Sequence, residues 1–394
     1  MKTIENANFN GKKVLVRVDF NVPVKDGKVT DDTRIRESLP TINKLLKDGA
    51  AIILMSHLGR PKGIDKTFTL RPVAEHLQQL LHRDVKFSED FIGENTTVLA
   101  KDLNPGDVLL LENVRFHAGE TKGDEELAKE ISLLGDTYVN DAFGTAHREH
   151  ASTATVARFF PGNKYFGLLL ANELKNLENV IHNAQSPYTA IIGGAKVSSK
   201  IPVIKNLIGK VDNLIIGGGM AFTFIKAAGG KIGKSLVEDD MLDETKSIVD
   251  EIKKKGVELY IPSDAVVADA FSNDANSKVI PADQIEDPWM GLDIGPESIK
   301  KFEKVIQESK TILWNGPMGV FEMDQFQTGT KEIALAVAEA TSKGTYSLAG
   351  GGDSVAAINK YLEPDQISYV STGGGAMLEY MEGKELPGVK AILD

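Results

Sequence analysis

The chain alternates short, almost wholly apolar segments with longer amphipathic ones along its whole length. Segments such as 51–55 (AIILM) and 108–111 (VLLL) show no polar alternation, which is typical of strands covered on both faces of a parallel sheet. The stretches between them, such as 33–47, carry apolar residues at helical spacing. Strands that alternate with helices favour parallel sheets with right-handed crossovers. We therefore predict an α/β fold with two parallel sheets flanked by helices, one in each half of the chain.

The same pattern predicts the individual elements. The expected strands are Lys13–Val18, Ala51–Met55, Val108–Leu111, Thr137–Asn140, Thr189–Ile192, Asn213–Ile216, Glu258–Ile261, Thr311–Trp314, Thr345–Ala349 and Ser368–Ser371. The expected helices are Thr33–Lys47, Leu70–Leu81, Asp124–Leu134, Asp240–Lys254, Pro296–Glu308 and Thr328–Thr341.

A break near the middle of the chain divides these elements into two groups. At 394 residues, the chain can hold two or three domains of roughly 100–200 residues each. The segment 159–163 (FFPGN) interrupts the pattern, and apolar residues then recur on one face of a helix: Leu170, Leu174, Leu177 and Ile181. Ser186-Pro187 is expected to end that helix. We predict a first lobe at 1–170, a connecting helix at 171–186 and a second lobe at 187–381.

Composition narrows the class of protein. A formal net charge of −11 argues against non-specific attraction to nucleic acid or to anionic membranes. The absence of cysteine excludes disulfides, thiol nucleophiles and cysteine metal sites, and it fits a reducing compartment. The N-terminus has no signal-peptide core, and no segment reaches the roughly 18 apolar residues that span a bilayer. We expect a cytoplasmic protein that binds neither nucleic acid nor membranes.

Arginine and glycine-rich turns divide between the two halves. All nine arginines lie within the first 158 residues, whereas IIGGAK, IIGGGM, LAGGGDS and STGGGA all follow Thr189. Guanidinium groups bind carboxylate and phosphate bidentately, and glycine clusters let backbone N–H groups approach the phosphates of a nucleotide. The division therefore indicates a small anionic ligand for the first half and a nucleotide for the second. Drift in codon usage, with glycines that serve only as turn residues, is the alternative.

In the first half, polar side chains follow the predicted strands at their carboxyl ends, where open parallel sheets bind ligands. The candidates there, with one at a helix start, are Asp19, Asn21, Arg34, His57, Arg60, Arg115, His147 and Arg148. A single arginine of this kind is more often part of a surface ion pair. Four at equivalent strand ends favour an anion site. The remaining arginines of helices and element ends are expected to be solvated: Arg36, Arg71, Arg83 and Arg158. The pair His147 and His150 is a weak metal signal without a third ligand.

In the second half, glycine pairs follow strands and precede helices. Gly193-Gly194 is followed by Lys196 and Lys200, which would share one face of a helix that starts there and would attract terminal phosphates. Asp353, beside another glycine cluster, suits a Mg²⁺ ligand or a helix N-cap, or both. The segment 314–322 (WNGPMGVFE) offers apolar groups for an adenine, and Glu322 could accept from ribose hydroxyls. A dinucleotide fingerprint of the form GxGxxG with a downstream acid is missing, which argues against a dehydrogenase.

Together these motifs resemble the phosphoglycerate kinase family over nearly the whole chain. They appear in the family's order: RVDFNVP, DDTRI, SHLGRPKG, LLLENVRF, VNDAFGTAHR, GGAKVSSK, IIGGGMAFTF, WNGPMGVFE, GGGDS and STGGGA. The resemblance implies two Rossmann-like lobes joined by a connecting helix and a hinge, with 382–394 folding back onto the first lobe. It also implies a monomer that acts in glycolysis and gluconeogenesis. The implied reaction is a reversible phosphoryl transfer, with Mg²⁺, from 1,3-bisphosphoglycerate to ADP, which gives 3-phosphoglycerate and ATP. The transfer is expected to be in line and to follow closure of the two lobes.

The resemblance also assigns residues to each ligand. For the acid they are Asp19, Phe20, Asn21, Arg34, His57, Leu58, Gly59, Arg60, Arg115 and Arg148. For the nucleotide they are Gly193, Gly194, Lys196, Lys200, Gly218, Gly291, Asn315, Pro317, Glu322, Gly351, Gly352, Asp353 and Ser354, with Asp353 towards magnesium. Two places look less typical of the family, and both could alter closure: Met377, where serine is common, and the connector start at 168–173 (LLLANE).

The implied reaction needs no general base. The carboxylate of 3-phosphoglycerate attacks the γ-phosphorus of ATP, and a carboxyl group that titrates near pH 4 is already ionised at about neutral pH. Catalysis then rests on positioning and charge neutralisation, for which we expect Arg34, Lys200 and the amides of Gly373 and Gly374 at the start of the last long helix. Two other hypotheses remain: a phosphotransferase for another phosphorylated acid, and a two-lobed sensor that binds both ligands without turnover.

Overall fold

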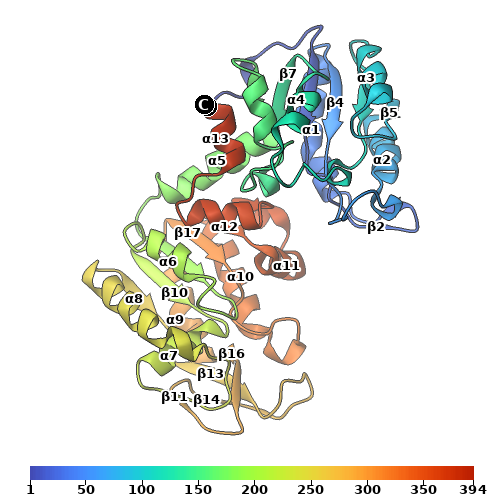
Figure 1. The fold of residues 1–394 in the computed structure, drawn as a ribbon. Helices are drawn as coiled ribbons and strands as arrows, with labels where there is room; N and C mark the ends of the chain where they lie inside the picture. Colours follow the sequence, from blue (N-terminus) through green and yellow to red (C-terminus); the bar gives the residue numbers. More distant parts are fainter. The chain divides into compact units, whose positions relative to one another are not determined.

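The computed structural model describes the whole chain, Met1–Asp394, and it divides into two compact units (Figure 1). The first unit comprises Met1–Lys175 and Glu385–Asp394, and the second comprises Asn176–Lys384. Each unit contains one six-stranded parallel sheet flanked by helices. The predicted α/β fold is therefore confirmed. No helix combines the length and the apolar character that crossing a membrane requires.

The sheet of the first unit has the strand order β5-β6-β4-β1-β7-β8, and every neighbouring pair is parallel. Its strands are β1 (Lys13–Arg17), β4 (Ala51–Met55), β5 (Val85–Phe87), β6 (Val108–Leu110), β7 (Thr137–Asn140) and β8 (Lys164–Phe166). In register, Arg17 at the end of β1 lies opposite Met55 on one side and Asn140 on the other. The loops that follow β1, β4 and β7 therefore leave the sheet at one edge.

Helices and short turns complete the first unit. The helices are α1 (Thr33–Lys47), α2 (Arg71–Leu81), α3 (Glu94–Lys101), α4 (Glu125–Ser132) and α13 (Pro387–Leu393). The 3-10 turns are η1 (Ile4–Asn6), η2 (Lys66–Phe68), η3 (Val114–Phe116), η4 (Phe143–Thr145) and η5 (Thr155–Phe159), and a small hairpin joins β2 (Val24–Lys25) to β3 (Lys28–Val29). Val16, Ile52 and Leu54 are fully buried in the core between sheet and helices, as their uninterrupted apolar strands predict.

The C-terminal helix α13 packs in the first unit, against η5 and β8 (Figure 1). Gly388 donates its N–H to the Ala146 carbonyl at 2.8 Å, and Asn140 donates from Nδ2 to the Gly388 carbonyl at 3.4 Å. A Cβ at Gly388 would lie 3.0 Å from Ala146 Cα, so the helix start approaches the backbone closely. The last ten residues are thus tied to the strand-end loops of the first unit.

The sheet of the second unit has the order β12-β10-β9-β17-β18-β19, again parallel throughout. Its strands are β9 (Tyr188–Ile192), β10 (Asn213–Ile216), β12 (Glu258–Tyr260), β17 (Thr311–Asn315), β18 (Tyr346–Gly350) and β19 (Tyr369–Ser371). The helices are α6 (Ile201–Leu207), α7 (Met220–Ala227), α8 (Leu242–Lys254), α9 (Pro296–Gln307), α10 (Thr328–Ser342), α11 (Gly352–Tyr361) and α12 (Gly375–Met381). The 3-10 turns are η6 (Asp239–Met241), η7 (Asp324–Phe326) and η8 (Pro364–Gln366).

The second unit also contains a small antiparallel sheet that the sequence pattern did not predict. β13 (Asp264–Ala268) pairs antiparallel with β14 (Ser277–Pro281) and with β16 (Met290–Ile294). A short parallel pair, β11 (Lys231–Ile232) and β15 (Gln284–Ile285), lies in the same part of the chain. β14 is mostly exposed, so it lacks the apolar run by which the buried parallel strands were recognised.

The connecting helix differs from its predicted extent of 171–186. α5 runs from Leu168 to Ile181, and the division between the two units falls inside it. It starts early because Thr41 Oγ1 and Asp141 Oδ1 accept the first amides, those of Leu168, Leu169 and Leu170. It ends early because the amides of residues 182 and 183 both donate to the Glu178 carbonyl, which closes the last turn well before Pro187. The predicted apolar face is buried: Leu170, Leu174, Leu177 and Ile181.

Candidate functional site

Three strand-end loops of the first unit are joined by hydrogen bonds between predicted site residues. Arg34, in the first turn of α1, donates to Asp19 Oδ2 at 2.9 Å, after β1. Asn21 Oδ1 accepts the Gly59 amide at 2.9 Å, which links the loop after β1 to the loop after β4. Arg115 in η3 donates to the Gly59 carbonyl at 2.7 Å. The structure thus brings Asp19, Asn21, Arg34, Gly59 and Arg115 together at the carboxyl edge of the sheet.

Unbalanced positive charge accumulates at this edge. Burial is the first cause of the lowered pKa of Arg115. The guanidinium groups of Arg17 and Arg60 lower this pKa further, and the carboxylates of Glu120 and Asp19 partly oppose the shift. Burial first, then Arg115, Arg17, Arg148 and the neighbouring His147, lowers the pKa of His150 to about 4. Arg60 and Arg148 are exposed. These positively charged groups lower one another's pKa values, and few carboxylates lie between them. The edge therefore favours an anionic ligand.

Two predicted acid contacts are buried apolar residues. Phe20 and Leu58 both belong to the core of the first unit. The Phe20 amide donates to Ser56 Oγ at 2.9 Å, and the Leu58 carbonyl accepts from Asn113 Nδ2 at 2.8 Å. Their contribution is to hold the two loops, since their side chains face the core.

Three buried polar residues of this region were not assigned to the site from the sequence. Arg17, Glu120 and Ser152 are each 0–1 % exposed and are joined by hydrogen bonds: Arg17 Nε donates to Ser152 Oγ at 2.8 Å, and Ser152 donates to Glu120. Arg17 also contacts His57, through Nη2 and Nδ1 at 3.2 Å. One signal in the sequence could have identified Arg17, because it ends the otherwise apolar run VLVR of a central strand.

The other arginines are surface residues, as predicted. Arg36 pairs with Asp32 at 2.9 Å within α1, and Arg158 pairs with Glu149 at 2.9 Å. Arg71 pairs with Glu89, and Arg83 donates to the Gly106 carbonyl at 2.6 Å. None of these contacts involves the strand-end loops after β1 and β4.

In the second unit, Lys200 lies over the ends of two central strands. Its Nζ donates to Asn315 Oδ1 at the end of β17, and Asn315 Nδ2 donates to the Gly350 carbonyl at 2.7 Å, at the end of β18. Ser354, in the first turn of α11, accepts the Gly316 amide on Oγ at 2.7 Å. Burial lowers the pKa of Lys200, and the nearby Asp353 carboxylate partly opposes the shift. The structure therefore brings Lys200, Asn315, Asp353 and Ser354 to one strand edge.

The glycines at this edge permit close backbone approaches. A Cβ at Gly193 would lie 2.1 Å from the Pro317 carbonyl oxygen. Gly351 has φ +97°, and a Cβ there would lie 2.6 Å from Asn315 Nδ2. Larger residues at either position would push the two strand-end loops apart.

The prediction that Lys196 and Lys200 share one face of a helix is wrong. Residues 197–200 form a turn, and α6 begins only at Ile201, with Lys200 as its N-cap residue. The turn is held by Ser198, whose amide donates to Glu238 at 2.9 Å, and by the Val197 carbonyl, which accepts the Lys200 and Ile201 amides. Lys196 is exposed, whereas Lys200 is partly buried.

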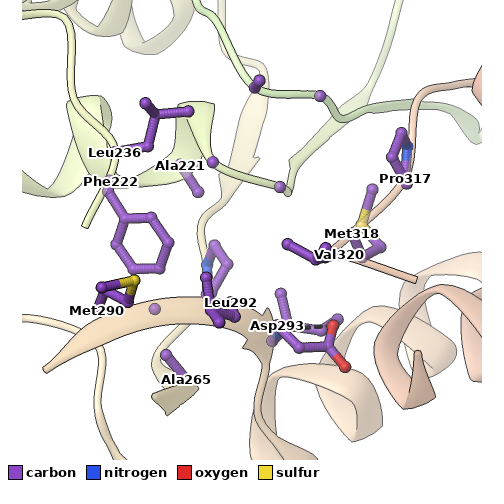
Figure 2. Close-up of a pocket in the computed structure, with 18 of the residues that line it drawn as sticks. Ala221, Phe222, Leu236, Ala265, Met290, Leu292, Asp293, Pro317, Met318 and Val320 are labelled. Carbon is purple, nitrogen blue, oxygen red and sulfur yellow. Dashed lines mark hydrogen bonds between the residues drawn. The ribbon is translucent and has the colours of Figure 1, made fainter. Parts of the chain in front are cut away.

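A cavity of about 690 Å³ opens beside these loops (Figure 2). Figure 2 shows its apolar wall, formed by Phe222 of α7, Met290 and Leu292 of β16, and Met318 and Val320 of the loop after β17. It is also lined by predicted nucleotide residues: Gly194, Gly218, Gly291, Pro317, Glu322 and Asp353. A Cβ at Gly291 would lie 2.0 Å from the Phe222 ring, so glycine keeps this wall flat. Its size and lining suit a nucleoside.

Asp353 lies in the first turn of α11 and does not cap the helix. It is exposed, and the N-cap residue is Gly351, so the N-cap interpretation is wrong. No cluster of three or more His, Cys, Asp or Glu residues suited to a metal ion occurs. A single carboxylate beside a phosphate site suits Mg²⁺, which is often held by one or two carboxylates together with substrate phosphates.

The predicted catalytic glycines precede a short helix, not a long one. Gly373 and Gly374 come directly before α12, which has 7 residues and is followed by α13. The Gly373 amide donates to Ser371 Oγ at 3.2 Å. The less typical Met377 is fully buried on α12 and packs against Gly350, where a Cβ would lie 2.0 Å from its sulfur. The methionine thus fills space that the glycine leaves.

Comparison with known proteins agrees with this geometry. The family model described as phosphoglycerate kinase matches residues 4–384. The phosphoglycerate kinase of Thermosynechococcus vestitus is 54 % identical over 98 % of this chain and 97 % of its own, and that of Porphyromonas gingivalis is 54 % identical over 99 % of both. The solved phosphoglycerate kinase of Coxiella burnetii is 43 % identical, with a TM-score of 0.93 over 99 % of this chain and 98 % of its own. That of Pyrococcus horikoshii is 33 % identical, with a TM-score of 0.80 over 100 % and 98 %. The chain belongs to the phosphoglycerate kinase family.

Proposed function

We propose that the chain divides its family's reaction between its two units, with the acid on the first and the nucleotide on the second. As a phosphoglycerate kinase family member, it is a phosphotransferase of glycolysis that interconverts 1,3-bisphosphoglycerate and ADP with 3-phosphoglycerate and ATP. Its nucleotide substrate is the Mg²⁺ complex. We place the reaction in the cytoplasm, where glycolytic intermediates are made and used.

The observation that carries this division is the contrast between the two strand edges. In the first unit, Arg34, Arg60, Arg115 and Arg148 surround loops without a matching number of carboxylates. In the second unit, Lys200 and Asp353 lie beside an apolar cavity of about 690 Å³. A doubly charged phosphate with a carboxylate suits the first edge, and a base with a phosphate chain suits the second.

On the acid side, each residue has a chemically distinct role. Arg60, Arg115 and Arg148 would bind the phosphate and carboxylate oxygens, each as a charge-assisted donor. Asp19 and Asn21 would bind the hydroxyl of the acid while they keep the loops after β1 and β4 in register. Arg34, which is 42 % exposed and paired with Asp19, lies at the rim of the site and would reach the transferring phosphoryl group.

On the nucleotide side, the cavity would take the adenosine and the glycine loops the phosphates. Glu322 would accept from the ribose, and Asp353 would hold Mg²⁺, which neutralises phosphate charge when it is bound. Lys200 donates from Nζ to Asn315 Oδ1, which would hold it over the phosphates. Its ammonium group would stabilise negative charge on the transferred group.

The reaction then requires positioning more than acid–base chemistry. The carboxylate of 3-phosphoglycerate attacks the γ-phosphorus of ATP, the bond to the β,γ-bridging oxygen breaks, and ADP leaves. The nucleophile is already ionised at about neutral pH, so no base has to take a proton. Arg34 and Lys200 would offset the developing charge, aided by the amides of Gly373 and Gly374. Because the substrates bind to separate units, transfer requires a closed state that excludes water.

The direct test is a coupled assay for ADP formation from Mg-ATP and 3-phosphoglycerate. Turnover should require both the phosphate of the acid and magnesium, so glycerate and a magnesium-free mixture serve as controls. Turnover with a different phosphorylated acid in place of 3-phosphoglycerate would identify another phosphotransferase. Stoichiometric binding of both ligands without ADP release would identify a sensor and refute the roles given to Arg34 and Lys200.

A further inference from the structure

Arg17 is a buried arginine, and each of its three guanidinium nitrogens contacts a partner within the first unit. It ends β1 in the centre of the first sheet and is 1 % exposed. Its Nε donates to Ser152 Oγ at 2.8 Å, its Nη1 donates to the Val18 carbonyl, and its Nη2 lies 3.2 Å from His57 Nδ1. A buried guanidinium is costly without such partners, and this one is held from three sides.

A buried carboxylate completes the set on the far side of Ser152. Glu120 is 0 % exposed, and its Oε2 accepts the Ser152 amide at 3.0 Å while its Oε1 accepts the Ser152 hydroxyl. The Ser152 carbonyl accepts from the Tyr138 hydroxyl at 2.8 Å, which fixes the backbone of the serine. Glu120, Ser152, Arg17 and His57 therefore form one continuous chain of hydrogen bonds.

The direction of every bond in this chain follows from Arg17. A guanidinium has five N–H donors and no acceptor. Ser152 Oγ must therefore accept from Arg17, and its own proton must point to Glu120. By the same reasoning, His57 Nδ1 must accept from Arg17 Nη2. A neutral imidazole with Nδ1 as acceptor carries its proton on Nε2.

The surroundings of His57 keep the ring neutral as well as oriented. The ring is 4 % exposed, and burial is the first cause of its pKa lying well below the usual range. The charged and titratable groups that face it act in the same direction: Arg17 of β1, Arg115 of η3, Arg34 of α1 and His150. A further positive charge on the ring would be repelled by these neighbouring groups.

We propose that Arg17, Ser152 and Glu120 are positioning residues that hold His57 as a neutral ring with its proton on Nε2, ready to donate to an oxygen of the bound acid. The inference rests on the placement of the acid at the first unit. The arginines of the rim supply the charge of the site, and His57 supplies one directed hydrogen bond whose strength does not change with pH in the neutral range. Arg17 acts through His57 and does not touch the acid.

The first test reads the tautomer in the unaltered protein. The chain has 7 histidines, so ¹⁵N-histidine labelling gives few signals, and the His57→Ala variant identifies those of His57 by their loss. We expect a His57 ring with an unprotonated Nδ1, a protonated Nε2 and no titration in the neutral pH range. A proton on Nδ1, or a ring that titrates near pH 6.5, would overturn the inference.

Addition of 3-phosphoglycerate then separates this inference from the acid site itself. The His57 Nε2–H signal should shift on saturation with the acid and should not shift with Mg-ADP. A ring with the expected tautomer that does not respond to the acid would refute the placement of the acid, and this inference with it. A ring that responds but carries its proton on Nδ1 would refute only the role of Arg17.

A double-mutant cycle tests whether Arg17 acts through His57. Arg17→Lys keeps the charge but cannot reach Ser152 and His57 together, so we expect the KM for 3-phosphoglycerate to rise about tenfold with the KM for Mg-ATP unchanged. In the His57→Ala background, the same substitution should change the acid KM less than twofold. Arg83→Lys, at an exposed arginine of the same unit, is the matched control. An equal rise in both backgrounds would show that Arg17 acts without His57 and would overturn the proposal.

Discussion

At the scale of single residues, Lys200 is partly buried and its ammonium group is held by Asn315, whereas Lys205 of the same unit is exposed. Lys200→Ala removes the ammonium group held by Asn315, and we expect kcat to fall by about 10²–10³ with little change in the KM for 3-phosphoglycerate. Steady-state kinetics with both substrates varied would measure this. Lys205→Ala, which removes an exposed lysine paired with Glu244, should leave kcat unchanged. A near-normal kcat in Lys200→Ala would remove this residue from the mechanism.

Arg148 offers the complementary residue-scale test on the acid side. The side chain is exposed, and a charge-assisted hydrogen bond contributes roughly 1.5–3 kcal/mol. Arg148→Ala should therefore raise the KM for 3-phosphoglycerate roughly tenfold or more and leave the KM for Mg-ATP unchanged. Arg158→Ala, ten residues along and paired only with Glu149, is the control. Unchanged acid affinity in Arg148→Ala would contradict the first-unit site.

At the scale of elements, the start of α5 depends on a buried carboxyl group. Asp141 Oδ1 accepts the amides of Leu169 and Leu170, and burial raises the pKa of this group to about 7. Between about pH 4 and pH 7, the folded chain holds a proton on Asp141 that the unfolded chain releases. The free energy of unfolding should therefore fall as pH rises through this window and level off above it. The contribution of Asp141 to this fall is at most about 4 kcal/mol.

The variant Asp141→Asn isolates that contribution. Asparagine is neutral at every pH and keeps an acceptor for the two amides. The loss of unfolding free energy between pH 5 and pH 8 that Asp141 causes in the parent chain should therefore be absent from the variant. His57 and His150, whose lowered pKa values act in the opposite direction at low pH, are present in both proteins and cancel. Urea unfolding followed by circular dichroism measures the difference. Asp84→Asn, at an exposed carboxyl of the same unit, should follow the parent chain. An identical pH dependence in Asp141→Asn would show that Asp141 is ionised throughout.

At the scale of the whole molecule, the two ligands should stabilise different units. A ligand at about 100 times its Kd stabilises the state that binds it by about 2.7 kcal/mol. Mg-ADP should slow amide hydrogen exchange in the segments around β17, β18 and α11, and 3-phosphoglycerate should slow it in the loops after β1 and β4. Mass spectrometry of peptides from each unit provides the measurement, with glycerate as the ligand control. Protection of first-unit loops by Mg-ADP alone would contradict the division of roles.

Much of this architecture could be predicted from the sequence, because the buried parallel strands and amphipathic helices each carry a local pattern. The helix expected at 33–47 has those bounds as α1, and the strand expected at 51–55 is β4. Of the antiparallel strands, β14 could not be found in this way, because it is mostly exposed and offers no periodicity. The prediction for Lys196 and Lys200 failed for a different reason. Glu238, which is distant in sequence, accepts hydrogen bonds from Ser198 and holds a turn where a helix was expected.

The sequence by itself determined which chemical groups stand at the strand ends, because strand and loop positions follow from local apolar patterns that each short segment carries alone. Arginines in one half and glycine-rich loops in the other were sufficient to indicate an anion and a nucleotide. Only the tertiary structure decided which groups are buried against one another, since the contacts of Arg17 with Ser152 and His57 join residues 135 and 40 positions apart. Burial and the partners of a buried charge are properties of the packed chain, so the protonation and direction of His57 could be inferred only from the fold.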